Sequence, residues 1–167
     1  MKKISMEMPK EEMFTIIQTC KKVNKKHRLK SIEQAIIIAR EEIPDNETEH
    51  MCFVLLNEYD LHIGTHLYHS TSSNKCVLDL TKVMRKIMGV PGVSSVVIVH
   101  NHPFTSELKP STNDVRWASH MATVFQLIGL NVLDFIIINH TNHYSFLESK
   151  KGIFKTAYNR VKKLLNL

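Results

Sequence analysis

Two histidines separated by one residue, His100 and His102, are the side chains of this sequence best placed to do chemistry. On an extended segment alternate side chains point to the same face, so the two imidazoles can approach one ion. Asp114 follows and can supply a carboxylate if the chain folds back. A catalytic zinc site uses three protein ligands and keeps its fourth position for water. We therefore expect His100, His102 and Asp114 to bind one zinc ion per chain and to support hydrolysis.

Each of these residues also has an ordinary structural explanation. Ser111 is a typical helix N-cap, and Asp114 would then lie in the first helical turn, where the helix dipole favours a carboxylate. Two histidines at a strand end can equally be one hydrogen-bonded side chain beside an exposed one. The combination of residues, rather than any single one, favours the metal site. The remaining candidates, His66, His69, His140 and His143, we interpret as surface histidines.

The segments around these residues predict an α/β fold with a mixed β-sheet flanked by helices. The β-branched run over 95–99 predicts a short strand that delivers His100 and His102 at its end. The segment over 49–57 is apolar on both faces, which predicts a strand covered on both sides. We expect further strands over 61–69, 132–139 and 144–147, and helices over 10–26, 31–43, 79–88 and 111–128 and from residue 151 onward.

Composition is that of an ordinary globular domain. The chain has 167 residues, of which 43% are hydrophobic and 23% charged, enough for one sizeable core. No apolar run is long enough to cross a membrane, and the N-terminus lacks the apolar region of a signal peptide. Cys20, Cys52 and Cys76 form no CxxC pair, so we interpret them as free thiols. These features predict a cytoplasmic location without membrane contact.

A dense basic block covers residues 21–30, and the net charge of the chain is +6. Such a block can bind nucleic acid or an acidic protein. Aromatic residues that would stack on single-stranded bases are not interleaved with its lysines. A solvated helix face is the alternative explanation, and both remain open.

Glu49, the run from His100 to Pro103 and the run from Pro110 to Asp114 together resemble the JAB/MPN (JAMM) metalloproteases. The His-Asn-His-Pro form is similar to the RadC-like branch of that family. The resemblance covers about residues 45–147 and implies a JAB/MPN (cytidine-deaminase-like) architecture. We accordingly expect a RadC-like JAB/MPN domain over 45–167 and an N-terminal helical extension over 1–44 that packs on it.

The resemblance implies a zinc metallopeptidase that cleaves a peptide or isopeptide bond in a protein or peptide substrate. Glu49 matches the catalytic glutamate that moves the proton between water and the leaving amine, with Glu47 as a nearby rival. Ser111 matches the residue that donates a hydrogen bond to the oxyanion. The segment between His102 and Ser111 is one residue longer than in the family and lacks the family's glycine. These differences affect the shape of the loop that would face the substrate more than they affect the metal ligands.

Two other functions are compatible with the same resemblance. A RadC-like factor associated with DNA and linked to its repair would use the basic block over 21–30, and its DNA affinity would fall steeply with salt. A catalytically silent MPN scaffold would mediate assembly. Silent members generally lose the metal ligands, whereas this chain retains His100, His102 and Asp114.

Overall fold

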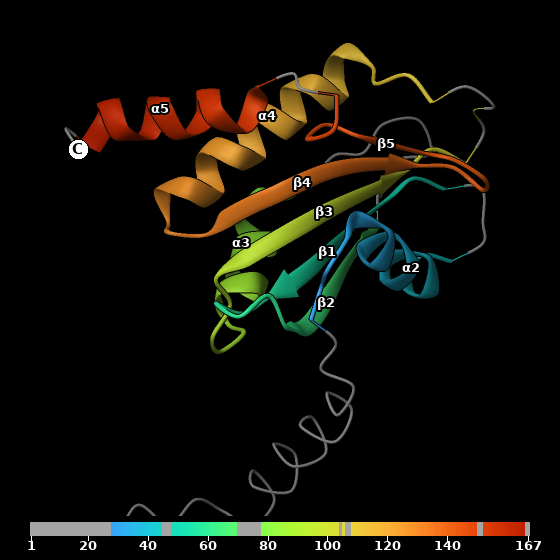
Figure 1. The fold of residues 1–167 in the computed structure, drawn as a ribbon, viewed down its shortest axis with the longest axis horizontal. Helices are drawn as coiled ribbons and strands as arrows, with labels where there is room; N and C mark the ends of the chain where they lie inside the picture. Colours follow the sequence, from blue (N-terminus) through green and yellow to red (C-terminus); the bar gives the residue numbers. More distant parts are fainter. Residues whose placement is uncertain are drawn as a thin grey trace, which may run out of the picture.

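The computed structural model contains a mixed five-stranded β-sheet between two helical layers (Figure 1). It describes residues 28–44, 48–69, 78–103, 105, 108–149 and 152–165. The strands are β1 (His50–Leu56), β2 (His62–His69), β3 (Ser95–Asn101), β4 (Asn131–Ile138) and β5 (His143–Ser145). The helices are α2 (Ile32–Glu42), α3 (Leu80–Met88), α4 (Thr112–Leu127) and α5 (Ile153–Leu165). The expected α/β class with a mixed sheet flanked by helices is confirmed.

Some expectations lie outside the described residues. These are the helix over 10–26, Glu47 and most of the basic block over 21–30. Within the described ranges, no helix has the length and apolar character needed to cross a membrane. The boundary expected at residue 44 stays a prediction, although α2 itself packs on the sheet.

The sheet has the strand order β2-β1-β3-β4-β5, with one parallel pair. β1 is antiparallel to β2 and β3, β3 is parallel to β4, and β4 is antiparallel to β5. Parallel strands need a crossover connection, and α4 supplies it between β3 and β4. Such a helix begins at the sheet edge where the first strand ends. This topology brings the N-terminus of α4 back to the carboxyl end of β3.

Both faces of the central strands are buried. On one face Phe53 and Ile98 pack with Phe125 of α4, in a cluster that also includes residues of α3. On the other face Val54 and Val97 pack against α2. The prediction that the segment over 49–57 is covered on both sides is confirmed, since every residue of β1 is buried.

Two details concern the ends of α2 and α5. Ser31 and Gln34 resemble a capping box, but the Ser31 side chain caps no backbone N–H among the described residues. Gln34 Oε1 instead accepts the N–H of Lys30, the residue before Ser31, at 2.6 Å. At the other end of the chain, Val161 is buried whereas Leu164 is 67% exposed, so the apolar stripe of α5 continues beyond its packed part.

The packing of α4 on the sheet predicts a contrast between two of its residues. Phe125 is fully buried and its ring stacks on Phe53 with centroids 6.3 Å apart, whereas Leu127 is 43% exposed. Phe125→Ala should lower the free energy of unfolding by about 3–5 kcal/mol, because it opens a cavity in the core. Leu127→Ala should change it by less than about 1 kcal/mol. Urea unfolding of both variants checks this, and equal effects would contradict the described orientation of α4.

Candidate metal centre

His100 and His102 extend from the same face at the carboxyl end of β3. The strand continues to Asn101, two residues beyond the β-branched run. The His102 N–H then donates to the carbonyl of Ile138 at 2.7 Å, which extends the pairing with β4 past the last strand residue. Because side chains alternate along extended backbone, both imidazoles lie on the face that α4 covers. His100 is 5% exposed, and its ring lies edge-on to that of His102 at 4.7 Å between centroids.

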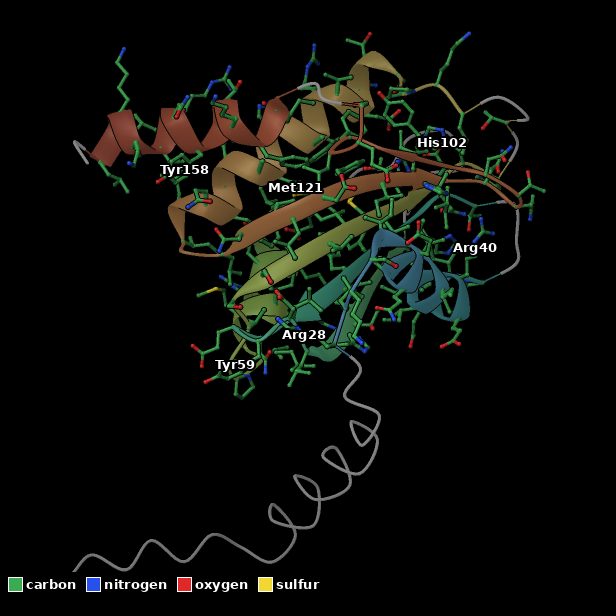
Figure 2. All side chains as sticks on the ribbon, in the orientation of Figure 1. Arg28, Arg40, Tyr59, His102, Met121 and Tyr158 are labelled. Atoms are coloured by element: carbon green, nitrogen blue, oxygen red, sulfur yellow. The ribbon has the colours of Figure 1, made fainter. Side chains whose placement is uncertain are left out.

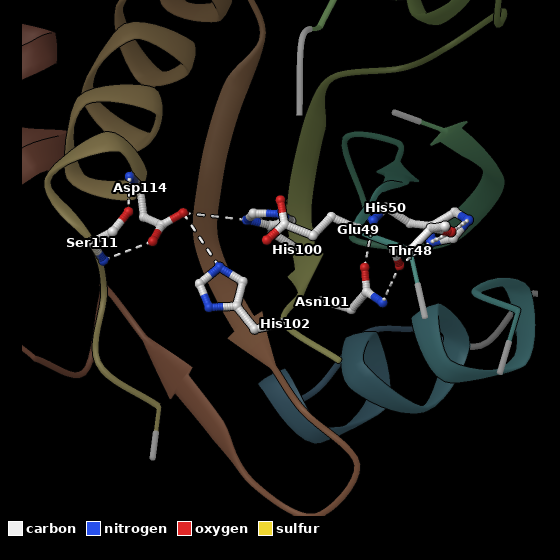
Figure 3. Close-up of polar contacts among 8 residues, drawn as sticks. All are labelled: Thr48, Glu49, His50, His100, Asn101, His102, Ser111 and Asp114. Carbon is white, nitrogen blue, oxygen red and sulfur yellow. Dashed lines mark hydrogen bonds and ion pairs between the residues drawn. The ribbon is translucent and has the colours of Figure 1, made fainter. Parts of the chain in front are cut away.

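Asp114 reaches these histidines from the first turn of α4. The Asp114 N–H donates to Ser111 Oγ at 3.2 Å, and the Ser111 N–H donates to Asp114 Oδ2 at 2.7 Å. This reciprocal capping box orients the carboxylate. Its other oxygen, Oδ1, lies 3.3 Å from His100 Nδ1 and 3.5 Å from His102 Nε2 (Figure 3). The structure therefore brings together the three residues expected to bind zinc.

Glu49 approaches the same cluster from the start of β1. The antiparallel register pairs Met51 with His100, so Glu49, two residues before Met51, lies on the same face of the sheet. Glu49 Oε2 lies 3.6 Å from His100 Nε2. The Glu49 side chain is 38% exposed, whereas that of Asp114 is 5% exposed. One carboxylate of the cluster is thus accessible to water and the other is enclosed.

Asn101 is the residue of this centre that sequence reasoning missed. It lies between the two histidines and points to the opposite face of the sheet. Its Oδ1 accepts the N–H of His50 at 2.5 Å, and its Nδ2 donates to the carbonyl of Thr48 at 3.1 Å. These two bonds hold the residues on either side of Glu49 (Figure 3). A polar residue within an apolar strand indicates a buried side chain that needs hydrogen-bond partners, but the sequence does not identify those partners.

The donor set fits a zinc ion. Among the described residues, neither ring nitrogen of His100 has a hydrogen-bond partner, although both are buried. Zinc–nitrogen and zinc–oxygen distances of roughly 2.0–2.1 Å place two tetrahedral ligands about 3.3 Å apart. The separations of 3.3 and 3.5 Å between Asp114 and the histidines agree with that value. They are long for hydrogen bonds between charged groups.

The geometry allows two sets of three ligands. The first set is His100, His102 and Asp114. The second is Glu49, His100 and His102, which offer one ligand atom each, and these three atoms lie within 4.8 Å of one another. His100 turns Nδ1 towards Asp114 and Nε2 towards Glu49, and one imidazole supplies one nitrogen to an ion. The carboxylate that is not a ligand would face the second nitrogen of His100.

The charges of these groups depend on one another. Burial lowers the pKa of His100, but the carboxylates of Asp114 and Glu49 raise it by more, so the net direction is upward. Burial raises the pKa of Asp114, yet contacts with both histidines and the hydrogen bonds of Ser111 hold it well below its usual value. The contact with His100 lowers the pKa of Glu49. The carboxylates thus favour the protonated form of His100, and His100 in turn favours the ionised form of both carboxylates.

The other expected residues lie as follows. The Ser111 hydroxyl accepts the capping bond from the Asp114 N–H and also contributes to the lowered pKa of the Asp114 carboxylate, so a catalytic hydrogen bond would have to share its hydrogen. His69, His140 and His143 are exposed, whereas His66 is partly buried and stacks on Phe53.

The chain is similar in sequence to known proteins. The chain is 27% identical over 123 residues to a UPF0758 protein of Streptococcus suis (strain 98HAH33), covering 74% of this chain and 49% of the relative. It is 25% identical over 125 residues to a UPF0758 protein of Staphylococcus haemolyticus (strain JCSC1435), covering 75% and 54%. A UPF0758 protein of Clostridium novyi (strain NT) is 27% identical over 111 residues, covering 66% and 48%.

The chain spans about half the length of the curated relatives it matches. The family described as the RadC-like JAB domain matches residues 29–153, a range that includes α2, the whole sheet and the cluster around His100. This match covers most of the chain and agrees with the mixed sheet and with the residues that first suggested the resemblance. The protein therefore belongs to the RadC-like JAB domain family.

Proposed function

We propose that this protein is a zinc-dependent hydrolase that cleaves a peptide or isopeptide bond. The observation that carries the proposal is the convergence of two histidines and two carboxylates around His100, whose buried ring nitrogens lack hydrogen-bond partners among the described residues. Buried polar atoms normally have partners, so an ion that accepts a nitrogen lone pair explains their arrangement. Zinc in such a site would polarise a carbonyl group and lower the pKa of water to about 7.

The ligands in this proposal are His100, His102 and Asp114. Asp114 is enclosed, and two bonds within the α4 cap fix its orientation, as a ligand requires. Its pKa is held below the usual range, so the carboxylate is available as an anion at any working pH. Glu49 is more exposed, so its carboxylate can exchange protons with bulk water.

Glu49 is assigned the proton transfer. Its carboxylate would take a proton from the attacking water and return it to the departing amine. Because its pKa is lowered by His100, Glu49 begins this cycle ionised. Ser111 lies beside Asp114 at the α4 N-terminus and would donate its hydroxyl hydrogen to the oxygen that becomes negatively charged.

Zinc uptake tests the ligand assignment. Wild-type protein should bind about one zinc ion per chain, and His102→Ala or Asp114→Ala should weaken binding by more than about a hundredfold, because even residues that only orient ligands cost 10–100-fold. His120→Ala, an exposed histidine on α4, is the matched control and should bind zinc normally. Elemental analysis and competition with a chelating dye measure this, and equal zinc content in all four proteins would contradict the site.

The same binding should depend on pH in a defined direction. The pKa of His100 is raised above its usual value by the two carboxylates, so zinc has to displace a proton. Apparent affinity should therefore rise with pH, by about tenfold per unit for one displaced proton below that pKa.

Glu49→Gln separates the two possible ligand sets. If Glu49 transfers protons and Asp114 is the ligand, the variant should keep its zinc and lose about 10²–10⁴-fold in kcat, because an amide accepts no proton. Zinc content and the hydrolysis of a peptide library are measured on the same preparation. Loss of zinc in Glu49→Gln would instead show Glu49 to be a ligand, and full activity would remove it from the mechanism.

Asn101 should act on the reaction by positioning Glu49. Asn101→Ala removes both bonds that hold residues 48 and 50, so kcat should fall about 10–100-fold while zinc content is kept. Asn57→Ala is the matched control, because the Asn57 side chain also makes two bonds to the backbone: its Oδ1 accepts the N–H groups of Tyr59 and Leu61 at the far end of β1. Comparable losses of kcat in both variants would indicate general destabilisation of β1 in place of positioning.

A further inference from the structure

A cavity lies on the face of the sheet opposite to the candidate metal centre. Its volume is about 190 Å³, roughly six times the volume of a water molecule in the liquid, which suits one side chain of moderate size. Ile43, Pro44, Pro103 and Ile138 form its apolar wall, and Asn101 and Asn139 contribute polar surface. Arg40 and His140 complete the lining.

Among the described residues that line the cavity, Arg40 alone carries a formal charge. Its Nη1 donates to the carbonyl of His140 at 2.8 Å, so the guanidinium bridges α2 and the turn between β4 and β5. A guanidinium has five N–H donors, and this bond uses one of them. No carboxylate belongs to the lining within the part of the chain that the structure describes. The cavity thus combines an aliphatic wall with a positioned donor group that prefers a carboxylate.

The hydrogen-bonding groups of the two asparagines in the cavity are already engaged. Asn139 Oδ1 accepts the N–H groups of Thr141 and Asn142, and its Nδ2 donates to the carbonyl of Thr105. Asn101 bonds to the backbone around Glu49. Arg40, by contrast, keeps guanidinium N–H donors beyond its bond to His140 that a guest could use. This argues for an anionic guest over a neutral polar one.

The cavity and the metal centre share the end of β3. His100 and His102 point to one face and Asn101 to the other, and Pro103 follows as part of the cavity wall. Arg40 and His102 lie at the same end of the sheet, opposite to Tyr59 (Figure 2). A peptide chain that crosses this sheet edge can present its scissile bond on one side and a neighbouring side chain on the other.

We propose that this cavity is a substrate subsite for a carboxylate carried on a short aliphatic stem, and that Arg40 determines its specificity. The inference rests on the proposed peptidase function, because it assigns the guest to the substrate of that reaction. Two sources have this chemistry, a glutamate side chain next to the scissile bond and the C-terminal carboxylate of a peptide.

Binding of uncleaved peptides to the zinc-free full chain tests the subsite. The probes are acetylated, amidated tetrapeptides that are identical except for Glu, Gln or Ala at one position, and the Ala peptide with a free C-terminus. Backbone amide shifts in ¹H–¹⁵N spectra report binding at each residue. The Glu peptide should shift the amides of Ile138, Asn139 and Asn101 and bind about fivefold more tightly than the Gln peptide, as expected for one partly exposed charge pair.

Variants identify the charge that is responsible. Arg40→Gln should abolish the difference between Glu and Gln peptides, and Arg40→Lys should keep part of it, because it retains the charge without the planar fork. Arg85→Gln is the matched control, since Arg85 is also an exposed arginine in the last turn of a helix, and it should keep the full difference. The spectra also report whether each variant is folded.

Several outcomes would overturn the subsite. These are equal binding of the Glu and Gln peptides, shifts confined to residues away from the cavity, or a preference for Glu that survives Arg40→Gln. Tighter binding of the free C-terminal carboxylate than of the Glu side chain would support the subsite and identify its guest as a chain end.

Zinc uptake and hydrolysis, measured on the same preparations, keep the two proposals separate. An Arg40-dependent preference without any zinc-dependent hydrolysis would contradict the peptidase function and leave a carboxylate site. Zinc-dependent hydrolysis that treats Glu and Gln peptides alike, in wild type and in Arg40→Gln, would contradict the subsite alone.

Discussion

Burial of the His100 imidazole is the constraint on which the candidate site depends. A polar ring enclosed to 5% exposure is costly unless its nitrogens have partners. Its two nitrogens face Asp114 on one side and Glu49 on the other, at distances longer than good hydrogen bonds. Contacts with the two carboxylates therefore offset part of the cost of burying this ring. A metal ion bound through one nitrogen of His100 would satisfy that nitrogen, and the separations of 3.3 and 3.5 Å from Asp114 to the histidines suit such an ion.

Because side chains alternate along β3, neighbouring residues of the candidate site lie on opposite faces of the sheet. His100 and His102 point towards α4 and its carboxylate, whereas Asn101 points away and fixes the backbone on either side of Glu49. One short strand end thus supplies two candidate ligands and the support for Glu49, the proposed proton acceptor. The cavity beside Arg40 lies on the opposite face from the candidate metal centre, so the proposed reacting bond and flanking side chain would lie on two sides of this strand end.

The sequence was sufficient for those parts of the fold and site that depend on local pattern. The spacing of His100 and His102 follows from strand geometry, and Ser111 and Asp114 follow from helix capping, so both pairs could be found by inspection. Bringing the two pairs together required the βαβ topology, which the strand-helix-strand pattern implied. The partners of Asn101 could not be found in this way, because they lie about fifty residues earlier in the chain. The bridge from Arg40 to His140 spans a hundred residues and left no local signal.

The capping box of α4 links the stability of the fold to the geometry of the site. The bonds between Ser111 and Asp114 satisfy backbone groups that a helix start would otherwise leave unpaired. They use one carboxylate oxygen and leave the other directed at the histidines. A capping box alone would also accept a neutral glutamine at this N3 position, but the proposed site requires a residue with a negative charge here. Asp114 is thus constrained twice, by the helix it begins and by the two imidazoles it faces. The two constraints agree because α4 starts where β3 ends, so the connection that completes the sheet also assembles the chemistry.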